Sequence, residues 1–384
     1  MLKAFQYRLY PSKAQEHKLE ATRETCRRWY NELLAERKTA YEQRGERIGK
    51  YDQLRQVKAH KASSPWAAVV HSHVLQLVVA DLDKAFQAFF RRVKAGEAPG
   101  YPRFKGSNRF ASFGFKEYGN GFKLDGRRLR VHGIGRIAVR WHRSLQGTIK
   151  TLRLIKKASG WYACFTAEVE PQVLAATERE VGVDVGIASL ITTSDGEHVP
   201  HQHWYRRAQQ KLRVLQRRVA RRTKGGKNRR KAVAALQRQH ERIANGRKDF
   251  LGKLAHRLVV SYDRIAVEDL RITNLVKNRH LAKSILDAGW AYFIGRLHSK
   301  AAEAGCVVVE VDPRNTSRTC SGCGHLFAGL TLNDRWIACH CGLSLDRDHN
   351  AAINIRNRGV PAGRGVRWAR SSPGGGLAQE AAEL

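Results

Sequence analysis

The chain has 384 residues, and its 70 Lys and Arg against 34 Asp and Glu give a formal net charge of +36. Because 42% of the residues are hydrophobic, the chain can bury a sizeable core, and its length predicts about two or three folded domains rather than a disordered basic tail. The charge favours a polyanion such as nucleic acid as the partner, with a basic scaffold protein as the alternative.

The sequence shows no signal for a membrane or for export. No apolar run approaches the roughly 20 residues that a membrane span needs, and no apolar signal segment follows Met1. We therefore expect a cytoplasmic protein that has no membrane partner.

The N-terminal third begins with a strand and continues with helices. Residues 1–10 alternate between apolar and polar side chains, as a strand does. Ser12 and Gln15 form a capping-box pattern at the start of a long amphipathic helix, and Ser64 followed by proline starts a second helix. We expect residues 12–95 to form a helical unit.

The pattern changes twice after this unit. From residue 110 to about 171, turn signals separate five to seven short strands, which predict a small barrel or curled sheet that the first strand joins. From Glu180 onward, strands alternate with helices: strands at 181–186, 264–270 and 306–311, a hairpin at 188–196, two basic helices within 204–258 and one helix at 284–304. The Gly-, Arg- and Pro-rich tail after Gly359 is expected to be unstructured.

Three carboxylates occupy unusual positions in this second part. Asp184 lies between valines in one strand, Glu268 ends another, and Asp348 directly precedes an apolar helical segment. A single buried carboxylate is usually a cap, a turn residue or half of an ion pair. Three that converge at strand ends need a cation such as Mg²⁺ or Mn²⁺, and with a charge of +36 they favour two-metal hydrolysis of phosphodiesters.

Four of the seven cysteines are clustered, as Cys320 and Cys323 and then Cys339 and Cys341. Two such knuckles predict one closed, structural Zn²⁺ site. The second knuckle is one residue tighter than usual, so His325 or His340 replacing a thiolate stays an alternative, as do four thiols without a metal.

Residues 206–248 hold 17 Lys and Arg and one acid, Glu241. A glycine turn at 224–227 divides this stretch into two helices. A solvated charged face is the ordinary interpretation, but the scarcity of acids favours contact with a nucleic-acid backbone. The candidate contact residues are Arg217, Arg218, Arg221, Arg222, Lys224, Lys227, Arg229, Arg230 and Lys231, together with Arg103 and Lys105.

Several motifs together resemble one protein family. These are Phe5–Ser12, Pro99–Lys105, Val183–Ile187, Val267–Leu270, Asp312–Cys320 and Asp346–Ile355. They resemble the TnpB (OrfB) proteins of insertion sequences, compact relatives of type V CRISPR effectors whose nuclease domain is a split RuvC domain. The resemblance covers nearly the whole chain apart from the tail.

The resemblance implies a fold class and domain boundaries. It implies an α/β and mixed multidomain protein, in which an RNase H-like RuvC nuclease domain with an inserted zinc ribbon follows a small β-barrel (wedge-like) domain that carries a helical recognition insertion. The expected boundaries are 1–10 plus 110–178 for the barrel, 11–109 for the helical domain, 179–318 plus 342–360 for the nuclease, 319–341 for the zinc finger and 361–384 for a flexible tail.

The resemblance also implies a function and its site. Asp184, Glu268 and Asp348 correspond to the catalytic carboxylates that hold two Mg²⁺ (or Mn²⁺) ions, with Asp346 as an alternative to Asp348. One ion activates water for in-line attack and the other stabilises the leaving 3′-oxygen. A guide RNA from the transposon end directs cleavage of both strands of double-stranded DNA beside a short target-adjacent motif, in the prokaryotic cytoplasm at the nucleoid.

Two other functions stay open. One is an RNA-independent nuclease or transposase-like enzyme that uses the same carboxylates, and the other is a nuclease-inactive nucleic-acid-binding regulator. The presence of all three carboxylates argues against the regulator. No protein oligomer is implied, and the charge predicts that the protein is unstable or aggregation-prone without its RNA.

Overall fold

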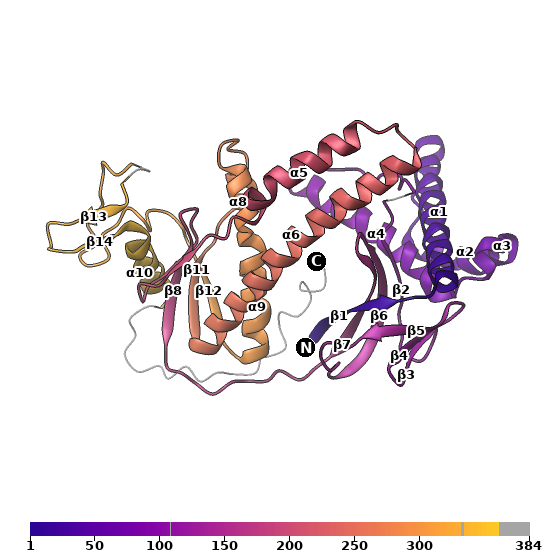
Figure 1. Cartoon of the computed structure of the whole chain (residues 1–384), viewed down its shortest axis with the longest axis horizontal. Helices are drawn as coiled ribbons and strands as arrows, with labels where there is room; N and C mark the ends of the chain where they lie inside the picture. Colours follow the sequence, from indigo (N-terminus) through magenta and orange to yellow (C-terminus); the bar gives the residue numbers. More distant parts are fainter. Residues whose placement is uncertain (108, 332–333, 361–384) are drawn as a thin grey trace. The chain divides into compact units, whose positions relative to one another are not determined.

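The computed structural model describes residues 1–107, 109–331 and 334–360. The chain folds into two compact units, Met1–Glu170 and Pro171–Leu384 (Figure 1). Within the described residues, no helix is long and apolar enough to cross a membrane. The tail at 361–384, which the sequence predicts to be unstructured, lies outside the described residues.

The first unit is built on an antiparallel seven-stranded sheet in the order β2-β6-β7-β1-β5-β4-β3. The predicted joining of the first strand is confirmed, because β1 pairs with both β5 and β7. The strands are β1 (Leu2–Tyr10), β2 (Ser112–Phe115), β3 (Phe122–Asp125), β4 (Arg128–Val131), β5 (Gly135–Arg140), β6 (Thr148–Lys157) and β7 (Gly160–Glu168).

This sheet is curled. Strands β2 and β3 follow each other in the chain but form opposite edges of the sheet. A flat sheet of this width would separate its edges by about 29 Å, whereas the chain from Phe115 to Phe122 spans about 24 Å when fully extended. The ring centroids of Phe115 and Phe122 lie 5.8 Å apart, so the two edges meet.

Four helices follow β1: α1 (Lys13–Arg44), α2 (Lys50–Ser63), α3 (Pro65–Ala68) and α4 (Ser72–Lys94). The predicted capping box of Ser12 and Gln15 starts α1. The prediction of one continuous helix from Ser64 is wrong, because the chain leaves the helix after α3. Helix α4 begins at Ser72, and its N-cap residue His71 accepts a hydrogen bond from the His73 backbone. Helix α2 is not predicted, since its sequence is polar on nearly all sides.

The second unit contains a mixed five-stranded sheet in the order β10-β9-β8-β11-β12. Strands β8, β11 and β12 are parallel, and β9 and β10 extend the sheet as an antiparallel hairpin. The predicted strands are confirmed as β8 (Glu180–Asp184), β9 (Ser189–Thr193), β10 (His198–Pro200), β11 (Arg264–Glu268) and β12 (Val307–Val311). A separate hairpin joins β13 (Trp336–Ala338) and β14 (Ser344–Asp346).

Helices cover both faces of this sheet (Figure 1). The two basic helices are confirmed, but the predicted single helix at 284–304 is wrong, because Gly289 adopts a φ of +73° and divides it. The helices are α5 (Trp204–Ala220), α6 (Lys227–Ser261), α7 (Ile272–Leu275), α8 (Ala282–Ala288), α9 (Trp290–Ala304) and α10 (Arg347–Gly359). Helices α6 and α9 pack on one face of the sheet and α10 packs on the other.

Helix α10 lies unusually close to the sheet. A Cβ atom added to Gly182 of β8 would lie only 2.0 Å from the carbonyl oxygen of Ala352 in α10, and one added to Gly359 would lie 2.5 Å from Ala266 Cβ of β11. Only glycine fits such a close approach of two backbones. Gly182 and Gly359 therefore allow α10 to lie close to β8 and β11.

Candidate functional site

Two predicted site residues lie side by side at the ends of parallel strands. Side chains alternate between the two faces of a strand. Val183 of β8 and Val267 of β11 pack in the core beneath α6 and α9, so Asp184 and Glu268 face the side that α10 covers. Val267 pairs with Val183, and the same register places Glu268 next to Asp184.

The third predicted carboxylate comes from α10. Asp348 lies in the first turn of this helix. Its carboxylate lies close to Gly186, which follows β8: a Cβ atom added to Gly186 would be 3.9 Å from Asp348 Oδ2. Asp346 is the N-cap residue, and its Oδ1 accepts hydrogen bonds from the backbone N–H groups of Asp348 (2.9 Å) and His349 (3.0 Å). Asp346 is thus engaged as a helix cap, and this favours Asp348 as the carboxylate that faces Asp184.

The electrostatics of the three carboxylates reflect their proximity. Burial raises the pKa of Asp184 well above its usual value, and the negative charges of Glu268 and Asp348 raise it further. Burial also raises the pKa of Asp348, and the negative charge of Asp346 raises it further. Burial raises the pKa of Glu268 too, but the hydrogen bond from the Thr316 hydroxyl and the positive charge of Arg358 partly offset this increase. An arrangement that disfavours ionisation of its own carboxylates favours a cation between them.

The four cysteines form a tighter group than the carboxylates. Their sulfur atoms all lie within 4.8 Å of one another, and of the residues described they are the only group of three or more potential metal ligands so close together. The carboxylates do not reach this spacing.

The cysteine cluster has dimensions that suit zinc. Cys320 Sγ is 3.7 Å from Cys341 Sγ, and Cys323 Sγ is 3.5 Å from Cys339 Sγ. Zn–S bonds of about 2.3 Å in a tetrahedron place the sulfurs about 3.8 Å apart. The tight Cys-x-Cys knuckle does not keep either cysteine out of the cluster, while His340 Nδ1 lies 3.7 Å from Cys339 Sγ.

Two thiols of the cluster, Cys320 and Cys339, have strongly shifted pKa values. Burial raises the pKa of Cys320, but backbone N–H groups of Cys323 and Gly322 and the neighbouring thiols outweigh it and lower the pKa to about 7. At Cys339 the Cys341 backbone N–H lowers the pKa, whereas burial and the adjacent thiols raise it to about 12. One thiolate therefore forms readily and disfavours the next, as expected of a cluster that a cation would neutralise.

Sequence analysis did not identify Thr316, Asn350 and Asn354. The Thr316 hydroxyl donates a hydrogen bond to Glu268 Oε1 at 2.5 Å, and both side chains are buried. Asn350 and Asn354 are buried on α10 and bind the backbone between residues 316 and 321. Their spacing of four residues places them on the same face of α10 as buried Ala351 and Ile355, and this spacing is the signal that could have identified them.

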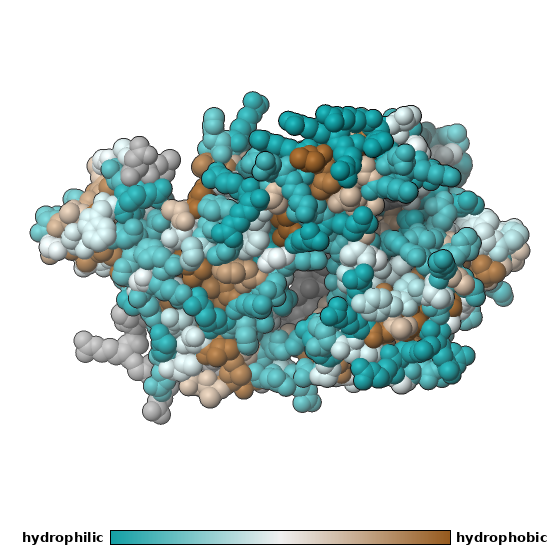
Figure 2. Space-filling model, viewed as in Figure 1, coloured by the Kyte–Doolittle hydropathy of each residue, from teal (hydrophilic) through white to brown (hydrophobic). Residues whose placement is uncertain are grey.

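The basic helices α5 and α6 form an exposed hairpin. Leu212 and Ala232 are buried, whereas the predicted contact residues at 217–231 are exposed apart from the half-buried Arg229. Arg229 donates to the Val219 carbonyl at 3.0 Å and so joins the two helices. Figure 2 shows hydrophilic side chains over α5 and α6, at the top of the view.

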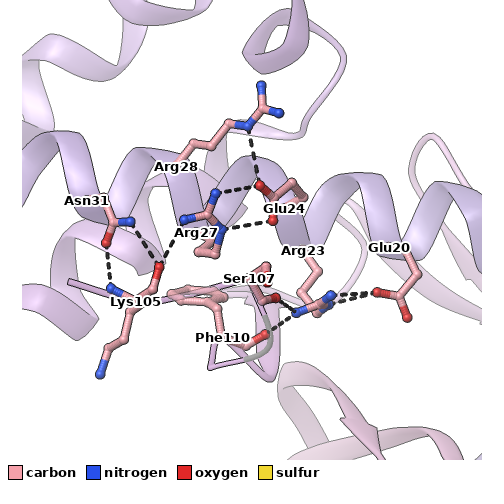
Figure 3. Close-up of polar contacts among 9 residues, drawn as sticks. All are labelled: Glu20, Arg23, Glu24, Arg27, Arg28, Asn31, Lys105, Ser107 and Phe110. Atoms are coloured by element: carbon pink, nitrogen blue, oxygen red, sulfur yellow. Dashed lines mark hydrogen bonds and ion pairs between the residues drawn. The ribbon is translucent and has the colours of Figure 1, made fainter. Parts of the chain in front are cut away.

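The predicted contact Lys105 lies on a segment whose backbone is bonded to α1 (Figure 3), and the other predicted contact, Arg103, precedes it by two residues. The carbonyl of Lys105 accepts hydrogen bonds from Arg27 (2.9 Å) and Asn31 (3.0 Å), and its N–H donates to Asn31 Oδ1. Arg23 binds the Phe110 carbonyl at 2.8 Å. The backbone is therefore held in place, while the Arg103 side chain is exposed.

Three family models match this chain. "Probable transposase" (OrfB of the IS605 type) matches residues 164–279, "Cas12f1-like, TNB domain" matches 290–355 and "Helix-turn-helix domain" matches 1–46. Residues 1–46 form β1 and α1 here rather than a helix-turn-helix.

Whole-chain relatives agree with these matches. A protein of Streptomyces pristinaespiralis named "Putative RNA-guided DNA endonuclease" is 34% identical over 96% of this chain and 93% of its own length. InsQ of Escherichia coli K12, which is also named a putative RNA-guided DNA endonuclease, is 30% identical over 92% of this chain and 91% of its own length. The chain therefore belongs to the TnpB (OrfB) family.

A solved structure shares the fold. The Cas12f1 chain in a cryo-EM structure of a complex with single guide RNA and target DNA superposes with a TM-score of 0.59, at 16% identity, over 90% of this chain and 82% of that chain. At this identity the similarity concerns the fold alone.

The raised pKa of Asp184 predicts a stability cost at neutral pH. In EDTA, Asp184→Asn should raise the free energy of unfolding at pH 7 by about 1 kcal/mol, because the amide stays neutral in both states and the unfolded state no longer gains stability from an ionised carboxylate. The wild-type penalty begins as the pH rises above about 4, where the unfolded carboxyl ionises and the folded one does not. Urea unfolding should therefore show that the variant exceeds the wild type in free energy of unfolding by more at pH 8 than at pH 5. Asp269→Asn, at an exposed neighbour, should show no such trend.

Proposed function

We propose that this protein is an RNA-guided DNA endonuclease that cleaves double-stranded DNA by metal-dependent hydrolysis of phosphodiesters. The observation that carries the proposal is the convergence of Asp184, Glu268 and Asp348 from β8, β11 and α10, where burial and mutual repulsion raise the pKa of Asp184. Relatives over more than nine-tenths of the chain are named for this activity. The net charge of +36 suits an enzyme that holds a guide RNA, a heteroduplex and a displaced strand.

We assign the parts of the chain as follows. Residues 179–318 and 342–360 are an RNase H-like RuvC domain, into which a zinc ribbon at 319–341 is inserted. Residues 1–10 and 110–178 are a wedge-like β-barrel, and 11–109 are a helical recognition domain. The guide RNA derives from the transposon end, the first two domains read the target-adjacent motif, and the RuvC site cuts both strands at the nucleoid.

The chemistry of the donors suits divalent cations. Carboxylate oxygens are the preferred ligands of Mg²⁺ and Mn²⁺, which supply Lewis-acid activation of water and stabilisation of the leaving oxygen. The charges of Glu268 and Asp348 both act on Asp184, so these three carboxylates would hold the cation together. Because the carboxylates must lose their protons to bind a cation, the raised pKa of Asp184 makes cation affinity fall as the pH falls.

The two aspartates at the start of α10 provide a sharp test of the site. Asp348→Asn should lower the rate of guided plasmid cleavage by on the order of 10⁴-fold, because it removes a metal-binding carboxylate. Asp346→Asn should keep most of the rate, since asparagine caps a helix about as well as aspartate. Guide-dependent DNA binding, measured by gel shift, should be unchanged in both variants.

Three results would contradict the proposal. Full cleavage by the Asp348 variant would move the site elsewhere, and cleavage of bare DNA without any RNA would favour an RNA-independent nuclease or transposase-like enzyme. Guided binding without cleavage by the wild-type protein in Mg²⁺ would favour a nuclease-inactive regulator. Sequencing the RNA that copurifies with the protein identifies the guide, and heterogeneous cellular RNA would argue against one.

We also propose that Cys320, Cys323, Cys339 and Cys341 hold one structural Zn²⁺. Cys323→Ser should lower the zinc content from one equivalent per chain and lower the melting temperature, because a thiolate ligand is lost. Cys164→Ser, in β7 of the other unit, should keep the full equivalent. Atomic emission spectroscopy measures the metal. One full equivalent in both a Cys323 and a Cys341 variant would refute four-thiolate binding.

The basic hairpin is proposed to bind nucleic-acid phosphates. Replacing Arg217, Arg218 and Arg221 by Ala should weaken binding for all target sequences and should reduce the slope of log K against log salt by about 0.9 for each lost phosphate contact on a duplex. The control removes the same charge at Arg179, Lys253 and Arg257, which lie outside the 206–248 stretch and each beside an acid. Equal slopes for the two triple variants would exclude the hairpin as a contact surface.

A further inference from the structure

The hydrogen bond from Thr316 to Glu268 is buried and directed. Thr316 is 3% exposed and Glu268 is 9% exposed. Thr316 Oγ1 lies 2.5 Å from Glu268 Oε1 and 3.1 Å from the Pro313 carbonyl oxygen. A hydroxyl has one proton to donate, and a bond to a carboxylate is about twice as strong as one to a neutral acceptor. The proton therefore goes to Glu268, and the bond restricts rotation of its carboxylate.

Helix α10 holds Thr316 in place. Asn354 Nδ2 donates to the Thr316 carbonyl at 2.8 Å and to the Thr319 carbonyl at 2.6 Å. One turn earlier, Asn350 Nδ2 donates to the Thr319 carbonyl at 2.7 Å, and its Oδ1 accepts from the Ser321 N–H at 2.8 Å. Both amides are buried, at 8% and 0% exposed. Two asparagines of one helix thus fix the backbone from residue 316 to 321.

The same helix and the same segment serve both sites of this unit. Helix α10 provides Asp348 in its first turn, and the segment at 316–321 contains Cys320 of the cysteine cluster. The position of Glu268 relative to Asp348 therefore depends on a chain of contacts from Glu268 through Thr316 and Asn354 to α10.

We propose that Thr316 is a positioning residue for Glu268 and that Asn354, supported by Asn350, sets the position of Thr316. This inference rests on the proposed function, because it requires Glu268 to act in cleavage. A hydrogen-bond partner of a metal-binding carboxylate typically changes metal affinity or activity by about 10- to 100-fold when it is removed. Because Cys320 lies on the same fixed segment, a change at the cysteine cluster also reaches Glu268.

The test compares two substitutions at Thr316 in the full-length protein with its guide RNA. Thr316→Val keeps the shape of the side chain but removes the hydroxyl, and should lower the cleavage rate and raise the half-saturating Mg²⁺ concentration, each by about 10-fold or more. Thr316→Ser restores the hydroxyl and should return both values most of the way to wild type. A purely structural role predicts no shift in Mg²⁺ dependence and no rescue by serine.

Binding of Mn²⁺ to the RNA-free chain, followed by electron paramagnetic resonance, provides a readout without cleavage. Thr316→Val should weaken this binding, whereas Asn357→Ala, at an exposed asparagine of α10, should not. Asn354→Ala should act through Thr316, so in the Thr316→Val background it should add less than twofold. Wild-type Mg²⁺ and Mn²⁺ dependence in Thr316→Val would overturn the inference, as would independent, multiplicative effects of the two substitutions.

Glu268→Gln separates this inference from the proposed function. If the glutamine variant cleaves guided DNA at the wild-type rate, Glu268 does not act in cleavage and the proposed site itself fails. If it loses cleavage while Thr316→Val keeps the wild-type rate and Mg²⁺ dependence, the site stands and the positioning role of Thr316 is wrong. Thermal melting of each variant confirms that the compared proteins are folded.

Discussion

The close approach of α10 to β8 and β11 is the constraint on which the carboxylate site depends. Gly182 and Ala266 leave almost no side-chain volume on the strand faces beneath the helix, and Gly359 fits against Ala266. The opposite faces of the same strands carry Val and Ile and pack in a conventional core. The strands thus have one face that stabilises the unit and another whose small residues allow a helix to bring a third carboxylate to their ends.

Two parts of this unit carry uncompensated charge, negative at the three carboxylates and positive on the α5–α6 hairpin. The carboxylates gather negative charge where burial opposes it, and the α5–α6 hairpin gathers positive charge where few acids oppose it. Each arrangement costs free energy in the isolated chain and becomes favourable with a partner of opposite charge, a divalent cation in one case and a nucleic-acid backbone in the other. Function and stability are therefore coupled through the same ligands.

The strands were predicted well because apolar runs leave local signals, and the acids at the ends of these runs led to the prediction of the carboxylate site. An apolar run with one acid at its end identifies β8 and β11, and the joining of the first strand to the curled sheet followed from the lack of another partner. The breaks at Val69–His71 and at Gly289 were missed because amphipathic periodicity continues across them.

The support around Glu268 could not be predicted, because it joins residues 48 positions apart through a hydroxyl and backbone carbonyls. Threonine in a polar loop has many ordinary uses, and a carbonyl group has no sequence signature at all. The two asparagines of α10 were not predicted either, because their partners depend on how the 316–321 segment folds back along the helix. Local patterns thus identify which groups react, whereas tertiary contacts decide what orients them.

The topology of the first sheet has a consequence for biosynthesis. Strand β1 is made first, yet it lies at the centre of the sheet, and one of its two neighbours, β7, is completed only at Glu168. The amino group of Met1 donates to the Val169 carbonyl at 2.8 Å, so the beginning and the end of this unit close on each other. Non-local pairing of this kind slows folding. On the ribosome, the helices between the strands can form early, while the sheet can be completed only after β7 has been synthesised.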